Sequence, residues 1–307
     1  MDEPATPTVE IATSAAVVRV APATGGAITD VMWRGQSALR ATPPAMRSEV
    51  RACACYPLVP YSNRIRDAVL HFAGRDHALA HNFGKHPHSI HGVGWQRPWR
   101  VARHGADTLL LELDHEITDA SARLAWPWPF TASHWLHVQE ADGRTILHAT
   151  LAIRSAADEA FPFGLGWHPF FPRVDDSMLE FTADAVWRND PTQLPIACEP
   201  IPPEWSFTTP RRLGDAVMDN VFIDWRGSAR LMQPGLGMAV TLEADRACDK
   251  LVVYSPPGAG FVAVEPVTNE TDAFNRAAAG ALGTGMRVLP PGAAFSCTMR
   301  LSIAPHE

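Results

Sequence analysis

Prolines and glycines interrupt this chain at short intervals, and their spacing constrains the fold more than any other feature. The 307 residues include 27 prolines and 21 glycines, so the segments between these residues are mostly short. An ordinary helix runs for about eleven residues, whereas an ordinary strand needs only about five. The spacing therefore favours strands, and we find no convincing amphipathic helix of ordinary length.

Alternating apolar residues and turn residues predict a series of β-hairpins. In residues 145–153, Leu147, Leu151 and Ile153 fall on one face, and the preceding Asp142-Gly143 is a typical hairpin turn. Strands follow one another without crossover helices, so we expect antiparallel pairing. The pattern predicts an all-β protein, a large antiparallel β-sandwich with few or no helices. Further strands are expected at residues 17–21, 27–33, 68–72, 77–80, 99–102, 108–113, 134–139, 177–186, 229–233, 238–244, 251–254 and 294–303.

Length and composition are compatible with one domain. Hydrophobic residues make up 46% of the chain, which is ample for a large core. β-Sandwiches often exceed 200 residues as a single unit. We expect residues 1–307 to form one β-sandwich catalytic domain, with residues 1–14 as a flexible N-terminal extension.

Charge and cysteine content indicate the compartment and exclude some partners. The formal net charge is −7 and there is no basic stripe, so we expect no nucleic-acid partner. The first ten residues lack the apolar region of a signal peptide, and no run approaches the roughly 18 apolar residues of a membrane span. Five cysteines without a CxxC motif are typical of reduced thiols. We expect a cytoplasmic protein without membrane contact.

The stretch Phe261–Asn275 places an acid at the end of an apolar strand. Glu265 follows four apolar residues, and Pro266 comes next. Because proline has no N–H to donate, we expect regular pairing to stop there. Taken alone, the stretch favours a solvated glutamate over a proton-transfer group.

Other polar residues stand beside glycine or proline, in loops that a β-scaffold would display. His168 is either a hydrogen-bonded core residue or a ligand-facing one, since glycines and aromatics flank it. Asp219, inside an apolar strand, needs a partner, which is either an arginine or a ligand. Arg64 is either part of an ion pair or a donor to a substrate oxygen.

The histidine loop of residues 81–91 invites a metal-binding interpretation, which we consider the weaker one. Pro87 between His86 and His88 argues against a regular strand, and no glutamate follows at the spacing of a cupin-type site. A serine hydrolase is also disfavoured, because the chain lacks a G-x-S-x-G motif and its strand–turn–helix context.

Five short motifs, taken in order, resemble the aldose 1-epimerase (galactose mutarotase-like) family over nearly the whole chain. They are Ser62-Asn63-Arg64-Ile65, Ile90-His91-Gly92, Trp167-His168-Pro169-Phe170-Phe171, Met218-Asp219-Asn220-Val221-Phe222 and Val264-Glu265-Pro266-Val267-Thr268. The resemblance implies a β-supersandwich with a sugar cleft, and a reaction that needs no metal or organic cofactor. It implies that Glu265 is the catalytic base and His168 the general acid. Arg64, His91 and Asp219 match sugar-binding positions, and Asn63 lies beside them.

The chain departs from the family pattern around the expected cleft. Val93 replaces a glycine, Phe170-Phe171-Pro172 replaces the usual Tyr-Phe-Asn, and residues 267–271 replace the commoner Trp-Thr-Gly. We therefore expect residues 267–275 to be where substrate choice differs. An aromatic residue, Trp95, Trp167 or Phe170, is expected to cover one face of the sugar.

The resemblance predicts an aldose 1-epimerase, an isomerase that interconverts α and β anomers. General acid–base catalysis by a carboxylate and an imidazolium suits this ring opening and reclosure. One alternative is a sugar-phosphate mutarotase, for which Arg66, Arg75 and Lys85 are candidate cations. Another is a non-catalytic carbohydrate-binding module on the same scaffold, and a metal-dependent isomerase is the least favoured.

Overall fold

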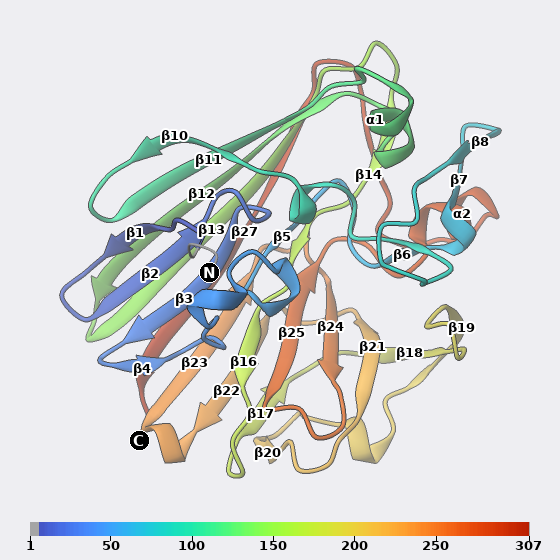
Figure 1. Cartoon of the computed structure of the whole chain (residues 1–307). Helices are drawn as coiled ribbons and strands as arrows, with labels where there is room; N and C mark the ends of the chain where they lie inside the picture. Colours follow the sequence, from blue (N-terminus) through green and yellow to red (C-terminus); the bar gives the residue numbers. More distant parts are fainter. Residues whose placement is uncertain (1–5, 307) are drawn as a thin grey trace.

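The computed structural model describes residues 6–306 and confirms the predicted all-β fold (Figure 1). Every pair of named strands in this range is antiparallel, as expected for strands joined without crossover helices. The two α-helices in this range are six residues each, α1 (Ala120–Ala125) and α2 (Ala273–Ala278). Residues 6–306 contain no helix long and apolar enough to cross a membrane.

The larger of the two main sheets has nine strands and contains the long hairpins predicted from the sequence. The Asp142-Gly143 turn joins β12 and β13, and Leu147, Leu151 and Ile153 are buried on one face, as the alternation predicts. In spatial order the strands are β10 (Arg100–His104), β11 (Thr108–His115), β12 (Phe130–Ala141), β13 (Arg144–Ser155), β27 (Ala294–Pro305), β23 (Met238–Ala244), β22 (Ser228–Gln233), β17 (Met178–Phe181) and β20 (Arg211–Arg212).

The second main sheet has eight strands and carries the Glu265 stretch near its middle (Figure 1, β24 and β25 in orange). In spatial order its strands are β19 (Pro195–Pro200), β18 (Ala185–Asn189), β21 (Met218–Ile223), β24 (Lys250–Ser255), β25 (Phe261–Val267), β15 (Gly166–Trp167) and β5 (Pro57–Leu58), and β16 (Phe170–Pro172) pairs separately with β25.

Smaller sheets complete the fold. The expectation of a flexible extension over residues 1–14 is wrong for its second half, because Val9–Ala12 form β1 and pair with β2. Residues 1–5 lie outside the described residues. The four-stranded sheet contains β1, β2 (Ala16–Ala21), β3 (Ala27–Trp33) and β4 (Gln36–Ser37), and the two-stranded sheets are β14 (Phe161–Phe163) with β26 (Arg287–Leu289), β6 (Arg64–Ile65) with β9 (Ser89–Ile90), and β7 (Val69–Phe72) with β8 (Arg75–Ala78).

Strand β25 separates two apolar clusters. Val262 and Val264 belong to the main core, together with inward residues of the nine-stranded sheet. Ala263 and Val267 belong to a second, smaller cluster. Because side chains alternate along a strand, Glu265 shares the face of the smaller cluster and not the main core.

The predicted end of this strand is wrong. The ladder between β24 and β25 continues through Pro266, which pairs with Leu251, to Val267, which pairs with Lys250. Proline is tolerated here even though the strand is central, and Glu265 is held inside the sheet. It therefore sits on a rigid backbone and is not a solvated residue at a strand end.

Candidate functional site

A cavity of about 300 Å³ gathers the six polar residues expected to bind the sugar or transfer protons, which are Asn63, Arg64, His91, His168, Asp219 and Glu265. It opens over the Glu265 face of the eight-stranded sheet, where β21, β24 and β25 lie side by side. Its lining is aromatic, with a few polar groups, as is usual for small-molecule sites. The residues lining it are Arg40, Arg51, Tyr56, Asn63, Arg64, Phe83, Ile90, His91, Trp95, His168, Phe170, Asp219, Val252, Tyr254, Phe261 and Glu265.

His168 faces Glu265 across the sheet because of strand register. It lies between β15 and β16, both of which pair with β25, and the ladder is interrupted only around it. Continuing the antiparallel register through the gap sets His168 opposite Glu265. The side chains meet, with His168 Nε2 at 3.2 Å from Glu265 Oε1. The flanking pairs are Gly166 with Val267 and Phe170 with Ala263.

Burial disfavours the charged form of both groups in this pair. Glu265 is 2% exposed, and burial raises its pKa well above 4.5, with Asp219 acting in the same direction. His168 is 7% exposed, and burial, followed by the charge of Arg40, lowers its pKa to about 3. Both shifts favour a pair that holds one proton and carries no net charge near neutral pH.

Asn63 and Asp219 fix the Arg64 side chain. Asn63 Oδ1 accepts hydrogen bonds from the Arg64 backbone N–H at 2.9 Å and from its Nη1 at 3.1 Å. Arg64 Nη2 donates to Asp219 Oδ2 at 3.1 Å, so of the two kinds of partner considered for this acid, the arginine is present. Such a planar, charge-assisted arrangement holds both groups in one orientation at the cavity.

His91 is presented to the cavity as a neutral hydrogen-bond donor. The Asn63 backbone N–H donates to His91 Nδ1 at 3.0 Å, so Nδ1 carries no proton and Nε2 carries one. Burial, helped by His168 and Arg64, lowers the pKa of His91 well below 6.5, which keeps the ring neutral. Both His91 and Asn63 have positive φ angles, 61° and 65°, in the loops that bring them together.

The segment after Glu265 positions the Arg64 loop and does not line the cavity. Asn269 accepts a hydrogen bond from the Ser62 N–H at 3.1 Å and donates to the Ser62 carbonyl at 3.0 Å. Asp272 Oδ1 accepts from the Arg66 N–H at 2.9 Å, and its own N–H donates to the Arg64 carbonyl at 2.8 Å. None of residues 267–275 lines the cavity, so an effect of these residues on substrate choice would act through the position of the Arg64 loop.

The structure identifies cavity residues that sequence reasoning missed. Tyr56 lies with its ring centroid 4.8 Å from that of His168, and Tyr254 pairs across strands with Asp219. Arg40 and Arg51 come from the polar, Pro-containing segment between β4 and β5. Tyr254 had a detectable signal, since it alternates in β24 onto the face of Val252. Arg40, Arg51 and Tyr56 belong to no motif.

The predicted aromatic residues divide between the cavity and the core. Trp95 and Phe170 line the cavity, and the Phe170 ring stacks on that of His168 at 4.4 Å. Trp167 points the other way, into the main core, where its Nε1 donates to His134 Nε2 at 3.2 Å. The expectation that Trp167 could cover a sugar is therefore wrong, because successive residues alternate in direction.

The cations proposed for a sugar phosphate lie outside the cavity. Arg66 pairs with Asp272 at 3.5 Å, Arg75 pairs with Glu159 at 3.8 Å, and Lys85 is not among the lining residues. In the part of the chain that the structure describes, no three His, Cys, Asp or Glu side chains cluster in a way that could hold a metal ion.

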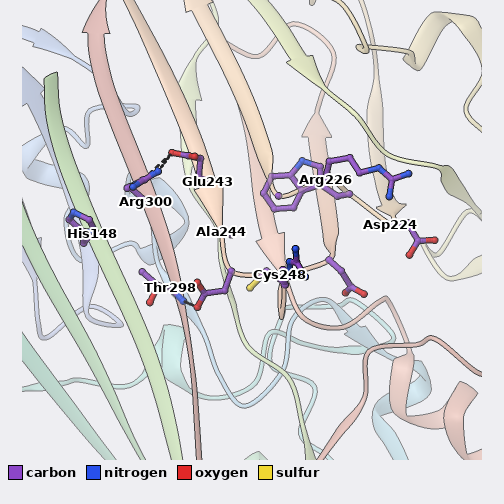
Figure 2. Close-up of a pocket in the computed structure, with 13 residues that line it drawn as sticks. His148, Asp224, Arg226, Glu243, Ala244, Cys248, Thr298 and Arg300 are labelled. Carbon is purple, nitrogen blue, oxygen red and sulfur yellow. Dashed lines mark hydrogen bonds and ion pairs between the residues drawn. The ribbon is translucent and has the colours of Figure 1, made fainter. Parts of the chain in front are cut away.

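A second cavity, of about 700 Å³, lies over β13, β23 and β27 and contains none of the predicted residues (Figure 2). Several of its charged groups already have partners. Glu243 accepts from Arg300 Nε at 3.0 Å, and Asp245 accepts from the Thr298 N–H at 2.8 Å. Arg226 pairs at 2.6 Å with Asp184, which is not among the lining residues. The first cavity, with its buried acid–base pair, is therefore the candidate site.

Comparisons with known proteins find relatives that match nearly the whole chain. The uncharacterised protein YphB of Escherichia coli K12 is 28% identical over 292 residues, which cover 91% of this chain and 93% of YphB. A crystal structure of a candidate aldose 1-epimerase from Escherichia coli K12 is 25% identical, with a TM-score of 0.87 over 98% of this chain and 99% of that one. A galactose mutarotase-like protein from Clostridium acetobutylicum shares the fold, at 19% identity and a TM-score of 0.83, over 97% and 95% of the two chains.

The match to a family is nearly as long as the chain itself. The family model described as aldose 1-epimerase matches residues 7–302. This span includes all the strands that carry the cavity residues. The chain therefore belongs to the aldose 1-epimerase family.

Proposed function

We propose that this protein is a cofactor-independent aldose 1-epimerase, which interconverts the α and β anomers of an aldose. The observation that carries the proposal is the buried pair in which His168 Nε2 lies 3.2 Å from Glu265 Oε1, inside a cavity. The mechanism requires one group that takes a proton and one that gives a proton, a few ångströms apart. A strand ladder holds these two in place.

Glu265 acts as the base and His168 as the acid in ring opening. Glu265 takes the proton of the C1 hydroxyl, the C1–O1 bond becomes a carbonyl, and the bond between C1 and the ring oxygen breaks. His168 donates its proton to the ring oxygen. The open aldehyde rotates about C1–C2, and the ring recloses on the other face with the two roles reversed.

The buried pair suits this cycle because ring opening gives one proton to Glu265 and takes one from His168. The total charge of the pair therefore does not change. The required form, a Glu265 carboxylate beside a His168 imidazolium, contains the same single proton as a neutral pair. The burial that disfavours both charges works against losing or gaining a proton as a pair. To reach the required form when substrate hydroxyls bind, the single proton of the pair needs only to move from Glu265 to His168, whose atoms Oε1 and Nε2 lie 3.2 Å apart.

Arg64, His91, Asp219 and Asn63 bind and orient the substrate. Arg64 and His91 Nε2 donate hydrogen bonds to sugar oxygens, and Asp219 accepts from a hydroxyl. Their mutual hydrogen bonds fix these groups before substrate arrives, which lowers the entropic cost of binding. Trp95 and Phe170 are available to cover the apolar face of the ring.

Substitution of the two proton-transfer groups tests the proposal. Glu265→Gln and His168→Ala should each lower the enzyme-catalysed rate of mutarotation at least about 100-fold, because one positioned acid or base contributes about 10²–10⁴-fold. Rates are measured by polarimetry on freshly dissolved single anomers. Near-wild-type rates in either variant would contradict the proposed roles.

A matched substitution controls for non-specific effects. Glu112 is an acid on β11 that pairs with Arg100, outside the cavity, so Glu112→Gln should leave the rate unchanged. The same variants distinguish a catalyst from a sugar-binding module. A binding module would retain its sugar affinity in Glu265→Gln and would accelerate mutarotation in no variant, including wild type.

A further inference from the structure

Two arginines of the cavity, Arg40 and Arg51, have no carboxylate partner within residues 6–306, although both line its wall. Arg40 is partly buried, and burial lowers the pKa of its guanidinium, yet an arginine stays charged at neutral pH. A charge removed from water without a partner is costly. An arginine in this situation inside a ligand cavity is prepared for an anion that the ligand brings.

The hydrogen bonds of Arg40 leave one edge of its guanidinium free. Nη2 donates to the carbonyls of Arg51 and Cys53, both at 2.7 Å, and the guanidinium stacks over Phe170 at 3.9 Å and Phe261 at 4.6 Å. Nε is buried and has no partner in the described chain. Nη1 also makes no hydrogen bond to residues 6–306 but is not sealed from solvent. The side chain is thus fixed in place, and Nη1 remains available to donate a hydrogen bond to a ligand.

Arg51 adds a second positive charge to the lining of the cavity. Its side chain is exposed and lies over the Phe83 ring at 5.1 Å, and its backbone carbonyl is one of the two that hold Arg40. The two guanidinium groups are therefore linked through the Arg51 main chain. An anion at this wall can be bound by one rigid and one adaptable arginine.

The carboxylates of the cavity do not neutralise these arginines. Asp219 is bound by Arg64, and Glu265 faces His168. The charges near Arg40 that favour its protonation belong to two tyrosines and a cysteine, which are neutral near pH 7. The hydroxyl groups of a neutral sugar supply hydrogen bonds but no counter-charge, so a neutral aldose would leave this wall uncompensated.

The place of Arg40 indicates which part of the sugar would carry the anion. The Phe170 ring lies between Arg40 and His168. It stacks on the His168 ring at 4.4 Å and lies beneath the Arg40 guanidinium at 3.9 Å. His168 is the group proposed to protonate the ring oxygen. In a pyranose, the ring oxygen is bonded to C5, and C5 carries C6. An orientation with C1 toward Glu265 and C5 toward Phe170 brings the substituent at C6 nearest the Arg40 side of the cavity.

We propose that the substrate is an aldopyranose with an anionic group at C6, a carboxylate or a phosphate, bound by Arg40 and Arg51. This inference rests on the proposed function for the placement of the ring, but its binding site is made of residues that the proton-transfer mechanism does not use. It names the substrate class of the same cavity.

An anion at this wall would also support the acid. Among the charges that lower the pKa of His168, that of Arg40 has the largest effect, ahead of Arg64. A bound carboxylate or phosphate offsets that charge and makes protonated His168 easier to form at the moment when it is needed. A neutral sugar gives no such assistance.

Anomer exchange measured by NMR on matched sugars tests the proposal. Glucose and galactose are compared with the corresponding uronic acids and 6-phosphates, which differ only at C6. We expect kcat/KM to be at least about 30-fold higher for an anionic sugar than for its neutral parent, as for one charge-assisted interaction. The better of the two arms identifies the anion. Neutral sugars turned over as well as both anionic forms would overturn the proposal.

Variants assign the preference to the two arginines. Arg40→Gln and Arg51→Gln should each lower the ratio of anionic to neutral kcat/KM at least about tenfold, and Arg40→Lys should retain part of it. Arg103→Gln removes the same charge from the exposed edge strand β10 and should leave the ratio unchanged. Because Arg51 is exposed, its variant tests the proposal even if Arg40→Gln folds poorly. An unchanged ratio in Arg51→Gln and Arg40→Lys would overturn it.

Binding measurements separate this inference from the proposed function. Isothermal titration calorimetry with the same sugars reports on the anion site without requiring turnover. If no sugar is turned over but anionic sugars bind more tightly in an Arg40-dependent way, the proposed function fails and the inference stands. If anomers are exchanged but the anion confers no gain in binding or rate, the inference alone fails.

Discussion

His168 and Glu265 are both nearly fully buried, and burial acts against both of their charges. For the imidazole this means a folded pKa of about 3 instead of 6.5, and for the carboxyl a pKa well above 4.5. The pair therefore keeps its single proton over a wide pH range. It gains a second proton only when the pH falls toward the lowered pKa of His168, and it loses its proton as the pH rises through the raised pKa of Glu265.

The pH dependence of catalysis follows from these directions. We expect kcat/KM to stay constant as the pH falls from 7 to 5, without the midpoint near 6.5 that an exposed histidine would give. Activity should fall on the alkaline side, as the pair loses its proton. The profile is measured by NMR anomer exchange with the spontaneous rate subtracted at each pH. An acid limb centred between pH 6 and 7 would contradict the buried, singly protonated pair.

Site residues that lie in motifs were predictable from the sequence, whereas site residues outside motifs were not. Asp219 stood out because an acid in an apolar strand needs a partner, and Arg64 is that partner. Nothing local distinguishes Arg40 from the other arginines of the chain. Its role comes from contacts with Phe170 and Phe261, more than 100 residues away, which only the folded sheet brings near.

Among the elements, the segment from Asn269 to α2 supports the candidate site without lining the cavity. Residues 269–275 are buried, the segment lines no part of the cavity, and its hydrogen bonds hold the loop that carries Asn63 and Arg64. Its departure from the family pattern is therefore better explained by loop support than by sugar contact. A residue that acts this way affects catalysis through the position of Arg64.

Asn269→Ala should separate support from chemistry. The substitution removes three hydrogen bonds of a buried side chain and leaves the Ser62 N–H and carbonyl without their side-chain partner. We expect a loss of about 3 kcal/mol in the free energy of unfolding, measured with urea. We also expect kcat/KM to fall about tenfold, measured where the variant is fully folded.

A core variant provides the control for lost stability. Leu151 is fully buried on β13 in the nine-stranded sheet, so Leu151→Ala should cost a similar 2–5 kcal/mol. Its activity per folded molecule should match wild type. If Asn269→Ala also retained full activity when folded, the segment would have a purely structural role.

Elements were predictable where the sequence alternates and unpredictable where sheet context overrides local rules. The β12–β13 hairpin follows from Asp142-Gly143 and the period-two pattern, which fix turn and face together. The strand end predicted at Pro266 was wrong because the proline removes only one hydrogen-bond donor. The rest of the ladder between β24 and β25 continues past it. The loops that complete the cavity are irregular, and their path depends on packing between distant segments.

Across the whole molecule, several histidines are buried in neutral form. His134 is fully buried in the main core, accepts a hydrogen bond from Trp167, and has its pKa lowered by burial to about 4. Because this folded pKa is below the unfolded value of 6.5, the unfolded chain binds more protons between the two. The contribution of His134 is therefore fully present above pH 6.5 and is lost as the pH falls toward 4.

His134→Gln should reduce the acid sensitivity of the fold. The lowered pKa corresponds to a loss of about 3 kcal/mol between pH 7 and pH 4, at about 1.4 kcal/mol per unit. Glutamine keeps an acceptor for Trp167 but does not titrate. The difference in unfolding free energy between the two pH values, measured with urea, should shrink by about that amount. His81→Gln, at an exposed position, should leave the difference unchanged, and an equal change in both variants would contradict the assignment.

The strand register that brings His168 opposite Glu265 has a consequence for how such a protein diversifies. The proposed chemistry depends on the spacing of two hydrogen-bonded strands, which substitutions in surrounding loops leave unaltered. The groups that would discriminate between sugars come largely from those loops, as Arg40 and Arg51 do. A lineage can thus change what it accepts by drift in its loops while inheriting an intact proton relay. Laboratory libraries confined to residues 40–51 and 82–96 would draw on the same freedom.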